Sequence, residues 1–428
     1  MIVLKNKKII FFIALPIVIL FVVCIFGLSQ SSDTENTTLP EDTVASENEK
    51  PVNGVIKGTD GWLYYASTLG DYTGSGNASD RKIYNTAHNI ALMQEFCESL
   101  GVSFVFTAAP NKNSVYYENM PSFYKRNTEN NNIARLIPLL KNENVNFVDL
   151  FTLFSESEEP LYLKTDSHWN NKGALIAFGA ILEALKKDYE PYEDGSFVYE
   201  ARECGDLEKA LEKDTPAFEE NYYYTEELGF TYKTKTESVE EPLILTGNPA
   251  ASGRLVMFRD SFGNSLLPFM ADNFSSACFS KGVPYMLEKF IQVYSADHVI
   301  VEVAERNVTD YAVAPPVFSG LEKELSPDIA EKDGISATVN IKASENAMDY
   351  LKIYGAINGD EAFTEVFVEI NGKCYEAFTV SDTEGDYSYL LYLPKDRLSG
   401  IDADVKIYIS ANGMAVKAAE QLVSLEDF

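Results

Sequence analysis

An aspartate and a histidine stand two residues apart in the segment 164–170, as Asp166 and His168. The chain has only three histidines, and this one directly precedes Trp169. An imidazole can act as a general base, and a carboxylate beside it fixes its tautomer and stabilises the imidazolium. The pair therefore predicts acid–base chemistry, provided that another part of the chain supplies a nucleophile.

Ser261 is the candidate nucleophile. It follows the predicted strand 254–258, which is apolar from Leu255 onward, and precedes a segment with helical spacing. It is therefore expected at the carboxyl end of a buried strand, where parallel sheets bind their ligands. Its backbone N–H would then lie near a helix N-terminus and help to hold an oxyanion.

Both features also have simpler explanations. A surface aspartate and a hydrogen-bonded histidine account for the Asp-x-His pair about as well as catalysis does. Asp260 or Ser261 could merely cap the following helix, which is common at a strand–helix junction. His88 lies within a helical pattern and is expected to be a packing or surface residue.

Alternating strands and helices are predicted to carry these residues. The apolar strands are continuous, which is typical of a parallel sheet covered by helices on both faces. The Asp-x-His loop is expected between a strand and a long helix, where a rigid scaffold positions it. Strands are predicted at 102–107, 145–150, 254–258 and 298–303, and helices at 83–100, 133–140, 174–185 and 266–270.

The N-terminal segment predicts a membrane anchor. Residues 9–28 carry no charge and follow three lysines. At about 1.5 Å per residue the run spans a bilayer core of roughly 30 Å. The positive-inside bias places the N-terminus in the cytoplasm and the remainder outside the cell membrane. A cleaved signal peptide is the alternative, and the length of the run favours an uncleaved anchor.

Composition limits the classes of function. The chain has 428 residues, a formal net charge of −30 and 46% hydrophobic residues, which is enough for two or three domains with real cores. The acidic excess argues against nucleic acid, because phosphate contacts need a basic face. A zinc site is not expected, since the histidines are scattered and no CxxC pair occurs. Four of the five cysteines lie outside the N-terminal apolar run 9–28. The sequence cannot assign their pairing, and free thiols are favoured.

Two regions depart from the alternation of strands and helices. Residues 190–249 are acidic and rich in tyrosine, and we interpret them as an insertion, either a flap near the site or a solvated excursion. From about residue 334, short alternating runs separated by turns are typical of a β-sandwich. The expected organisation is an anchor at 1–28, a flexible linker at 29–52, an α/β domain at 53–330 with this insertion, and a β-sandwich at 331–428.

The serine and Asp-x-His segments together resemble the SGNH (GDSL-type) hydrolase superfamily. Residues 260–264 are similar to its serine block, and residues 148–173 to its Asp/His block and closing helix. The blocks stand in reversed order, as in a circular permutant. If the chain is rotated to start at Leu255, the serine strand is followed by the strands that end at 304–307 and 110–112, and then by the Asp/His block, which is the superfamily order.

The permuted order with Asp-x-His-Trp resembles the AlgX and AlgJ family of alginate O-acetylation proteins, and still more the DHHW family. Two departures stand out. Ser167 occupies the place of the first histidine of the DHHW name, and the oxyanion asparagine of the superfamily has no clear counterpart. The candidates for oxyanion or substrate binding are Arg306, Asn307, Asn111, Lys112 and Trp169.

The resemblance implies an SGNH-like serine O-acetyltransferase or acetylesterase that acts on a cell-surface polysaccharide. Ser261 would attack the acetyl carbonyl, His168 would take its proton, and Asp166 would orient His168. No metal or soluble cofactor is expected. The resemblance also implies an acetyl donor supplied across the membrane by an acyltransferase of the MBOAT type, and a C-terminal sandwich that binds carbohydrate. The alternative is a non-catalytic glycan-binding or structural protein of the cell envelope.

Overall fold

The computed structural model describes residues 50–425, apart from 284, 326–327, 346, 360–362, 382–386, 399, 401 and 412–413. The predicted anchor at 9–28 and almost all of the predicted linker at 29–52 lie outside the described residues. Within the described ranges, no helix is both long and apolar enough to cross a membrane. All described residues belong to one compact unit, Ala45–Phe428.

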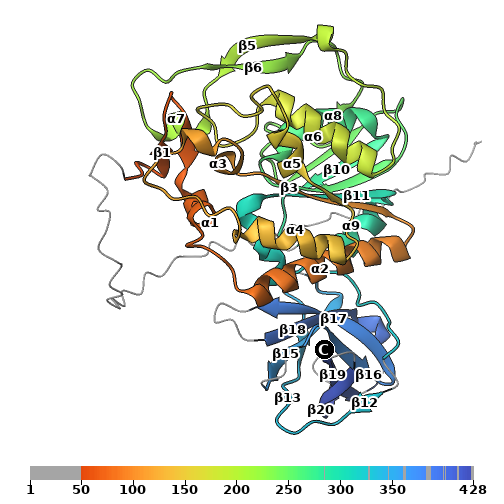
Figure 1. Ribbon diagram of the computed structural model, residues 1–428. Helices are drawn as coiled ribbons and strands as arrows, with labels where there is room; N and C mark the ends of the chain where they lie inside the picture. Colours follow the sequence, from red (N-terminus) through yellow and green to blue (C-terminus); the bar gives the residue numbers. More distant parts are fainter. Residues whose placement is uncertain are drawn as a thin grey trace, which may run out of the picture. The chain divides into compact units, whose positions relative to one another are not determined.

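A seven-stranded sheet carries the candidate site (Figure 1). Five strands are parallel, as the sequence predicts. The last two strands are antiparallel to their neighbours and extend one edge of the sheet. In sheet order the strands are β4 (Phe147–Val148), β3 (Ser103–Ala109), β11 (His298–Ala304), β9 (Arg254–Phe258), β10 (Ser276–Ser280), β8 (Leu243–Gly247) and β7 (Thr231–Tyr232).

The order of the central strands is the one obtained by rotating the chain to start at Leu255. Strand β11 lies between β9 and β3, and β4 follows β3. Parallel strands end at the same edge of a sheet, so the segments after β9, β11 and β3 come together. These segments contain Ser261, residues 305–307 and Asn111.

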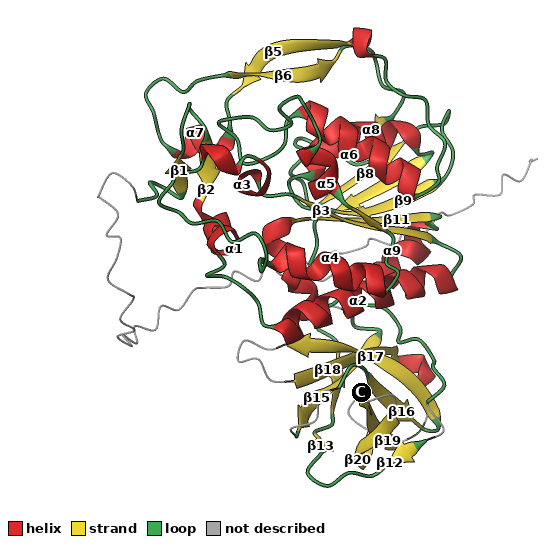
Figure 2. Ribbon diagram, viewed as in Figure 1, coloured by secondary structure: helices red, strands yellow, loops and turns green. Residues whose placement is uncertain are grey.

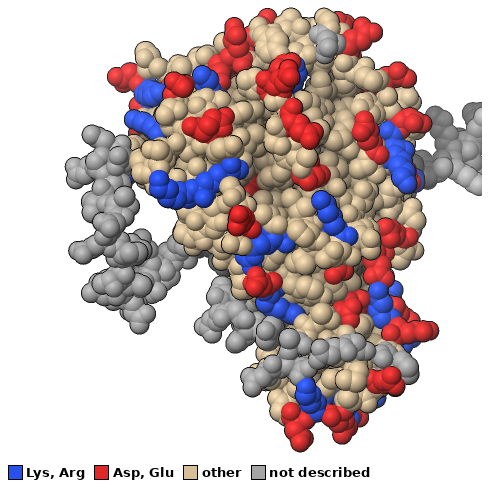
Figure 3. Space-filling model, viewed as in Figure 1, with Lys and Arg blue, Asp and Glu red and all other residues tan. Residues whose placement is uncertain are grey.

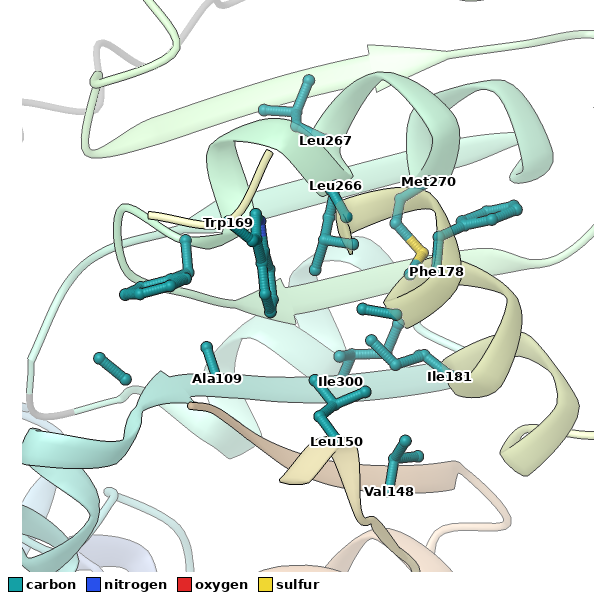
Figure 4. Packing of buried hydrophobic residues seen from close by; sticks show 14 of the residues in the cluster. Ala109, Val148, Leu150, Trp169, Phe178, Ile181, Leu266, Leu267, Met270 and Ile300 are labelled. Carbon is teal, nitrogen blue, oxygen red and sulfur yellow. The ribbon is translucent and has the colours of Figure 1, made fainter. Parts of the chain in front are cut away.

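Helices cover both faces of this sheet, which explains why its central strands are apolar throughout (Figure 2). Figure 4 shows one of the two cores, in which Phe178, Ile181 and Met270 pack beside Ile300 of β11. This face is covered by α5 (Leu150–Ser155), α6 (Asn171–Ala184) and α8 (Gly263–Asn273), and the other by α2 (Asp80–Ser99), α4 (Asn132–Asn142) and α9 (Leu287–Tyr294).

The strand predicted at 145–150 is shorter than expected, since only Phe147 and Val148 pair with β3. The chain leaves the sheet at Asp149, whose carboxylate accepts a hydrogen bond from the Thr152 N–H at 3.1 Å. This cap starts helix α5 directly after the strand. Leu150, expected in the strand, is therefore the first residue of helix α5, and its side chain packs in the core.

The segment interpreted as an insertion at 190–249 divides into two parts. Its first part forms an antiparallel pair of β5 (Phe197–Glu203) and β6 (Glu219–Tyr224) (Figure 1). The helix α7 (Asp206–Ala210) belongs to the segment of chain that connects these two strands. Its last part supplies β7 and β8 to the main sheet. The apolar run 243–245 is therefore part of the main sheet and not of a solvated excursion.

The C-terminal part is all β, as predicted, but its strands are linked into one path of hydrogen-bonded neighbours. In a sandwich a strand can pass from one sheet into the other at a corner. Here the nine-residue strand β17 pairs with β16 through its first half and with β18 through its second half. The strands follow the order β12 (Ile329–Ala330), β20 (Met414–Ser424), β19 (Asp402–Ala411), β16 (Val366–Ile370), β17 (Lys373–Ser381), β18 (Tyr387–Pro394), β15 (Tyr350–Asn358) and β13 (Ser336–Ala337), with β14 (Asn340–Ala343) also paired to β15.

The four cysteines among the described residues are free, in agreement with the favoured reading of the sequence. Cys97, Cys204 and Cys278 are buried, and Cys374 is half-buried. Burial raises the pKa of each of these four thiols above its ordinary value. None of the four is therefore activated as a thiolate nucleophile.

Candidate active site

Ser261, His168 and Asp166 form a continuous chain of hydrogen bonds. The Nε2 atom of His168 lies 2.8 Å from Ser261 Oγ, and its Nδ1 atom lies 2.8 Å from Asp166 Oδ1. Ser261 and His168 are 93 positions apart in the sequence, and the fold brings them together. The arrangement has the geometry in which an imidazole can remove a proton from a hydroxyl while a carboxylate orients it.

The turn after β9 fixes Ser261 through its neighbour Asp260. One carboxylate oxygen of Asp260 accepts a hydrogen bond from the Phe262 N–H at 2.9 Å, and the other accepts one from the Ala304 N–H at 2.7 Å. The turn is thereby tied to the end of the adjacent strand β11. Helix α8 has no side-chain cap, so the hydroxyl of Ser261 contacts His168 and does not serve as the helix cap.

The loop that holds Asp166 and His168 is fixed by Lys112, which the sequence suggests as a substrate-binding residue. Its buried ammonium donates hydrogen bonds to the carbonyl oxygens of Leu163 and Lys164 at 3.0 and 2.9 Å, and to that of Asp166. Burial lowers the pKa of Lys112 to about 7. Because its donors are used by the loop, Lys112 positions the aspartate and is not free to bind substrate.

Asp206, at the start of α7, also contacts this loop, and sequence reasoning missed it. Its backbone N–H donates to Asp166 Oδ2 at 2.9 Å, while its carboxylate accepts from the Ser167 N–H at 2.7 Å and from Ser167 Oγ at 2.5 Å. Asp206 Oδ2 lies 3.8 Å from His168 Nδ1. No local motif marks this residue in an acidic segment, so only the folded chain reveals the contact. Ser167, at the position of the first histidine of the DHHW name, ties the loop to the insertion.

The electrostatics of the site favour a protonated imidazole. Burial alone would lower the pKa of His168, but the hydrogen bond and charge of Asp166, with the charge of Asp206, outweigh it, so the pKa lies above its ordinary value. Burial likewise opposes ionisation of Asp166, and its hydrogen bonds from His168 and Asp206 hold its pKa well below the ordinary value. Asp166 therefore stays ionised and can stabilise an imidazolium during proton transfer.

A pocket of about 280 Å³ opens onto this site. Its wall includes Ser261, His168 and Arg306. The guanidinium of Arg306 lies 5.6 Å from the ring centre of Tyr65 and 5.7 Å from that of Phe262. Among the described residues it has neither a hydrogen bond nor an ion pair, so its donors remain available in the pocket. The insertion contributes Asp206, Leu207 and Ala210 to the same wall.

Glu305 is the first residue of the segment that follows β11. Glu305 is buried and accepts hydrogen bonds from the Asn111 N–H and from Ser114 Oγ, both at 2.7 Å. Burial raises the pKa of Glu305 to about 7. Within the described ranges Glu305 makes no ion pair with Arg306, so these two side chains do not close the sheet end as a charged pair.

The remaining candidates lie at different depths. Asn307 lines a second pocket, of about 350 Å³, which also touches Ser261. Asn111 is buried, and neither polar atom of its side chain has a hydrogen-bond partner in the described part of the chain. Trp169 is also buried, and its ring centre lies 5.1 Å from that of Phe262. Trp169 therefore supports the residue next to Ser261 from within the core, and does not line the pocket.

Two groups near Ser261 can donate to a developing oxyanion. The backbone N–H of Ser261 lies just before α8 and makes no hydrogen bond to another described residue. Arg306 is the second group. A tetrahedral intermediate needs donors about 2.7–3.1 Å from its oxygen.

One cluster of potential metal ligands was found among the described residues. It consists of Asp166, His168 and Asp206, whose ligand atoms lie within 4.8 Å of one another. A cation bound there would compete for His168 Nδ1 with Asp166 Oδ1. It would therefore disturb the hydrogen bond that orients the imidazole towards Ser261.

A serine, a histidine and an aspartate thus meet at the carboxyl edge of this sheet. Residues 55–245 match the family model described as "SGNH hydrolase-like domain, acetyltransferase AlgX". The resemblance to this family that the sequence indicates is thereby confirmed for this part of the chain. The match includes Asp166 and His168 and ends before Ser261.

Several solved structures are also similar to this chain. Bacillus cereus PatB1 matches with a TM-score of 0.46 at 16% identity, covering 59% of this chain and 96% of that one. A DHHW family protein from Eubacterium siraeum matches with a TM-score of 0.45 at 20% identity, covering 61% and 93%. The O-acetyltransferase domain of Pseudomonas putida AlgJ matches with a TM-score of 0.42 at 17% identity, covering 60% and 92%. Among curated proteins, no sequence matches this chain. With TM-scores below 0.5, these structures decide nothing about the activity of this chain.

Proposed function

We propose that this protein is a serine O-acetyltransferase or acetylesterase that acts on a polysaccharide. The observation that carries the proposal is the chain of two 2.8 Å hydrogen bonds from Ser261 through His168 to Asp166. The description of the matching family as an acetyltransferase supports acetyl as the group transferred.

The reaction divides into two half-reactions at Ser261. In the first, Ser261 Oγ attacks the acetyl carbonyl of the donor and His168 Nε2 takes its proton. The tetrahedral intermediate then expels the donor oxygen, which receives that proton, and leaves acetyl on Ser261. In the second, His168 removes a proton from a sugar hydroxyl, or from water in an esterase, and this oxygen attacks the acetyl-serine. His168 finally returns the proton to Ser261 Oγ.

The proposal includes a location and partners. Residues 9–28 would anchor the protein in the cell membrane with its folded part outside, and an MBOAT-type acyltransferase would supply the acetyl donor. The C-terminal β domain would bind carbohydrate. Nucleic acid is not a proposed partner. Figure 3 shows acidic and basic side chains interspersed on the displayed face, without a continuous basic band.

Turnover of a small ester distinguishes this function from a non-catalytic glycan-binding or structural role. Full-length protein in detergent is expected to release p-nitrophenol from p-nitrophenyl acetate, because that ester presents an activated acetyl group to Ser261. An absence of release and of acetyl transfer to oligosaccharides, from protein that is folded by circular dichroism, would favour the non-catalytic alternative.

The pH dependence should report His168. The imidazole must be neutral to act as base, and Asp166 and Asp206 raise its pKa. We therefore expect kcat/KM for p-nitrophenyl acetate to rise with pH, with a midpoint above the ordinary histidine value of about 6.5. Stopped-flow rates across the acidic and neutral range measure this midpoint. A flat profile between about pH 5 and 8 would exclude His168 as the base.

Replacing Asp206 by asparagine should move that midpoint to lower pH. The substitution removes a negative charge close to His168 Nδ1, which otherwise stabilises the imidazolium, and retains the backbone N–H that binds Asp166. The matched control is Asp214→Asn, at an exposed position of the same insertion. If both variants keep the wild-type midpoint, Asp206 has no electrostatic role at the site.

A further inference from the structure

A groove of about 610 Å³ begins at the residues that flank the Asp166–His168 pair. Lys164, Thr165 and Asn170 of this loop belong to its wall. Trp62 and Tyr162, both almost fully buried, also line it. Ser167 and His168, from the same loop, line the pocket of Ser261 instead. A molecule that occupies the groove therefore lies against the loop that carries the candidate base.

Two aromatic side chains of the inserted hairpin are exposed in this groove. Tyr199 of β5 is 57% exposed, and Phe218, just before β6, is 59% exposed. The ring of Tyr199 lies 5.1 Å from that of Tyr222, which in turn stacks on Phe197 at 4.1 Å. Tyr199 is thus supported by its neighbours on the hairpin, yet much of its surface faces solvent. Exposed aromatic surface next to polar groups in a concave wall is typical of a binding site.

The charges of the groove favour an uncharged ligand. Lys172 forms an ion pair with Glu159, and the ammonium of Lys164 contacts the Asp60 carbonyl at 3.3 Å. Glu219 is also occupied, because it accepts hydrogen bonds from the loop. Glu220 is exposed and adds a further negative charge. The wall as a whole carries three carboxylates, of Glu159, Glu219 and Glu220, against the two ammonium groups of Lys164 and Lys172, so a polyanion would meet a net negative charge.

A neutral sugar chain has the matching chemistry. The C–H faces of pyranose rings stack on aromatic rings, and the hydroxyls around their edges bond to carboxylates, amides and phenols. The groove offers both kinds of group in Tyr199, Phe218 and Glu220. Its volume is also larger than that of the pocket at Ser261, which suits several sugar units and not a single acetyl group.

We propose that this groove binds the acceptor glycan, a neutral polysaccharide, with sugar rings stacked on Tyr199 and Phe218. The glycan would pass along the Asp166–His168 loop and present a hydroxyl to the acetyl-serine. The delivery step rests on the proposed function, whereas the binding of glycan does not. The inserted hairpin would then select the acceptor, while the main sheet carries the chemistry.

Binding of defined oligosaccharides to full-length protein in detergent tests the groove directly. Titration calorimetry with chitohexaose and cellohexaose, as neutral probes, is compared with a uronic-acid hexasaccharide as the anionic probe. We expect at least one neutral probe to bind, and Tyr199→Ala and Phe218→Ala each to weaken it by about tenfold, the loss that follows truncation of an aromatic side chain that carries binding energy. Tyr199→Phe should retain binding, because the ring remains. Tyr232→Ala removes an exposed aromatic of β7 outside the groove and should leave affinity unchanged.

The outcomes separate this inference from the proposed function. If it is right, the groove variants keep wild-type hydrolysis of p-nitrophenyl acetate, and a neutral glycan acceptor shows a raised KM. If ester turnover is absent but the neutral glycan binds through Tyr199 and Phe218, the groove stands and the catalytic proposal fails. The groove is excluded as an acceptor site if no neutral probe binds, if only the uronic-acid probe binds, or if the two alanine variants bind as tightly as the wild type.

Discussion

Alanine at Ser261 or at His168 is expected to lower kcat for ester turnover by about a thousandfold or more. Ser261→Ala removes the attacking oxygen, and His168→Ala removes the base, whose Nε2 atom lies 2.8 Å from that oxygen. The double variant should lose little more than either single one, because the two residues act in the same step. Single-turnover and steady-state rates on p-nitrophenyl acetate measure these losses.

The matched control for the histidine is His298→Gln. His298 starts strand β11, at the opposite end of the parallel sheet from Ser261, and its ring lies 5.5 Å from that of Phe274. This variant should keep wild-type turnover. Losses that multiply in the Ser261/His168 double variant would mean that the two residues do not share a mechanism.

Arg306→Ala is expected to lower kcat by about 10²–10³-fold with the fold intact, the range seen when a donor to an oxyanion is removed. Arg306 lines the pocket with Ser261 and His168, and its guanidinium has no hydrogen-bond or ion-pair partner among the described residues. Its stacking on Tyr65 and Phe262 holds it there without using its donors. The Ser261 N–H would be the other donor. Steady-state kinetics and thermal unfolding of the variant provide the test.

Comparison with Asn307→Ala and Arg306→Lys sharpens this test. Asn307 lines the neighbouring pocket, so its loss should affect kcat less than the loss of Arg306. Lysine keeps the charge and loses the planar fork of donors, so partial recovery is expected. If Arg306→Ala instead lowers the melting temperature while its folded fraction retains full kcat, Arg306 is structural. The second donor would then be sought at Asn111, whose buried amide is unpaired within the described residues.

Much of the α/β domain follows from local sequence. The strand predicted at 254–258 is β9, and the helix predicted at 174–185 is α6 (Asn171–Ala184). Continuous apolar strands require cover on both faces, which the two sets of helices provide. The rotated order of blocks also predicts that the segment at 304–307 lies beside the Ser261 strand, and the parallel pairing of β11 with β9 agrees.

The contacts that position the catalytic loop do not follow from local sequence. Lys112 and Asp206 reach this loop from 54 and 40 positions away, and neither residue stands in a pattern that marks its role. Lys112 bonds to backbone carbonyl oxygens, and the Asp206 N–H bonds to the carboxylate of Asp166, which also holds His168. Such bonds depend on tertiary structure, so Lys112 was interpreted as a substrate ligand and Asp206 was not identified.

The C-terminal strands show a related limit. Strand β16 (Val366–Ile370) alternates between buried and half-buried residues, which is the pattern that predicts a half-exposed strand. Strand β17 is buried at five consecutive positions, so it lacks the alternation by which a half-exposed strand is recognised. It is also the strand that links the two halves of the sheet, since it pairs with both β16 and β18.

The central claim is that acetyl passes through Ser261, and trapping the acyl-enzyme tests it most directly. Full-length protein is mixed with p-nitrophenyl acetate, quenched in acid within the first turnover, digested and examined by mass spectrometry. The account predicts one acetyl group on the peptide that contains Ser261, formed together with a burst of p-nitrophenol, and no such peptide from Ser261→Ala. Continued turnover with Ser261 unmodified, or acetyl found only on another residue, would contradict it.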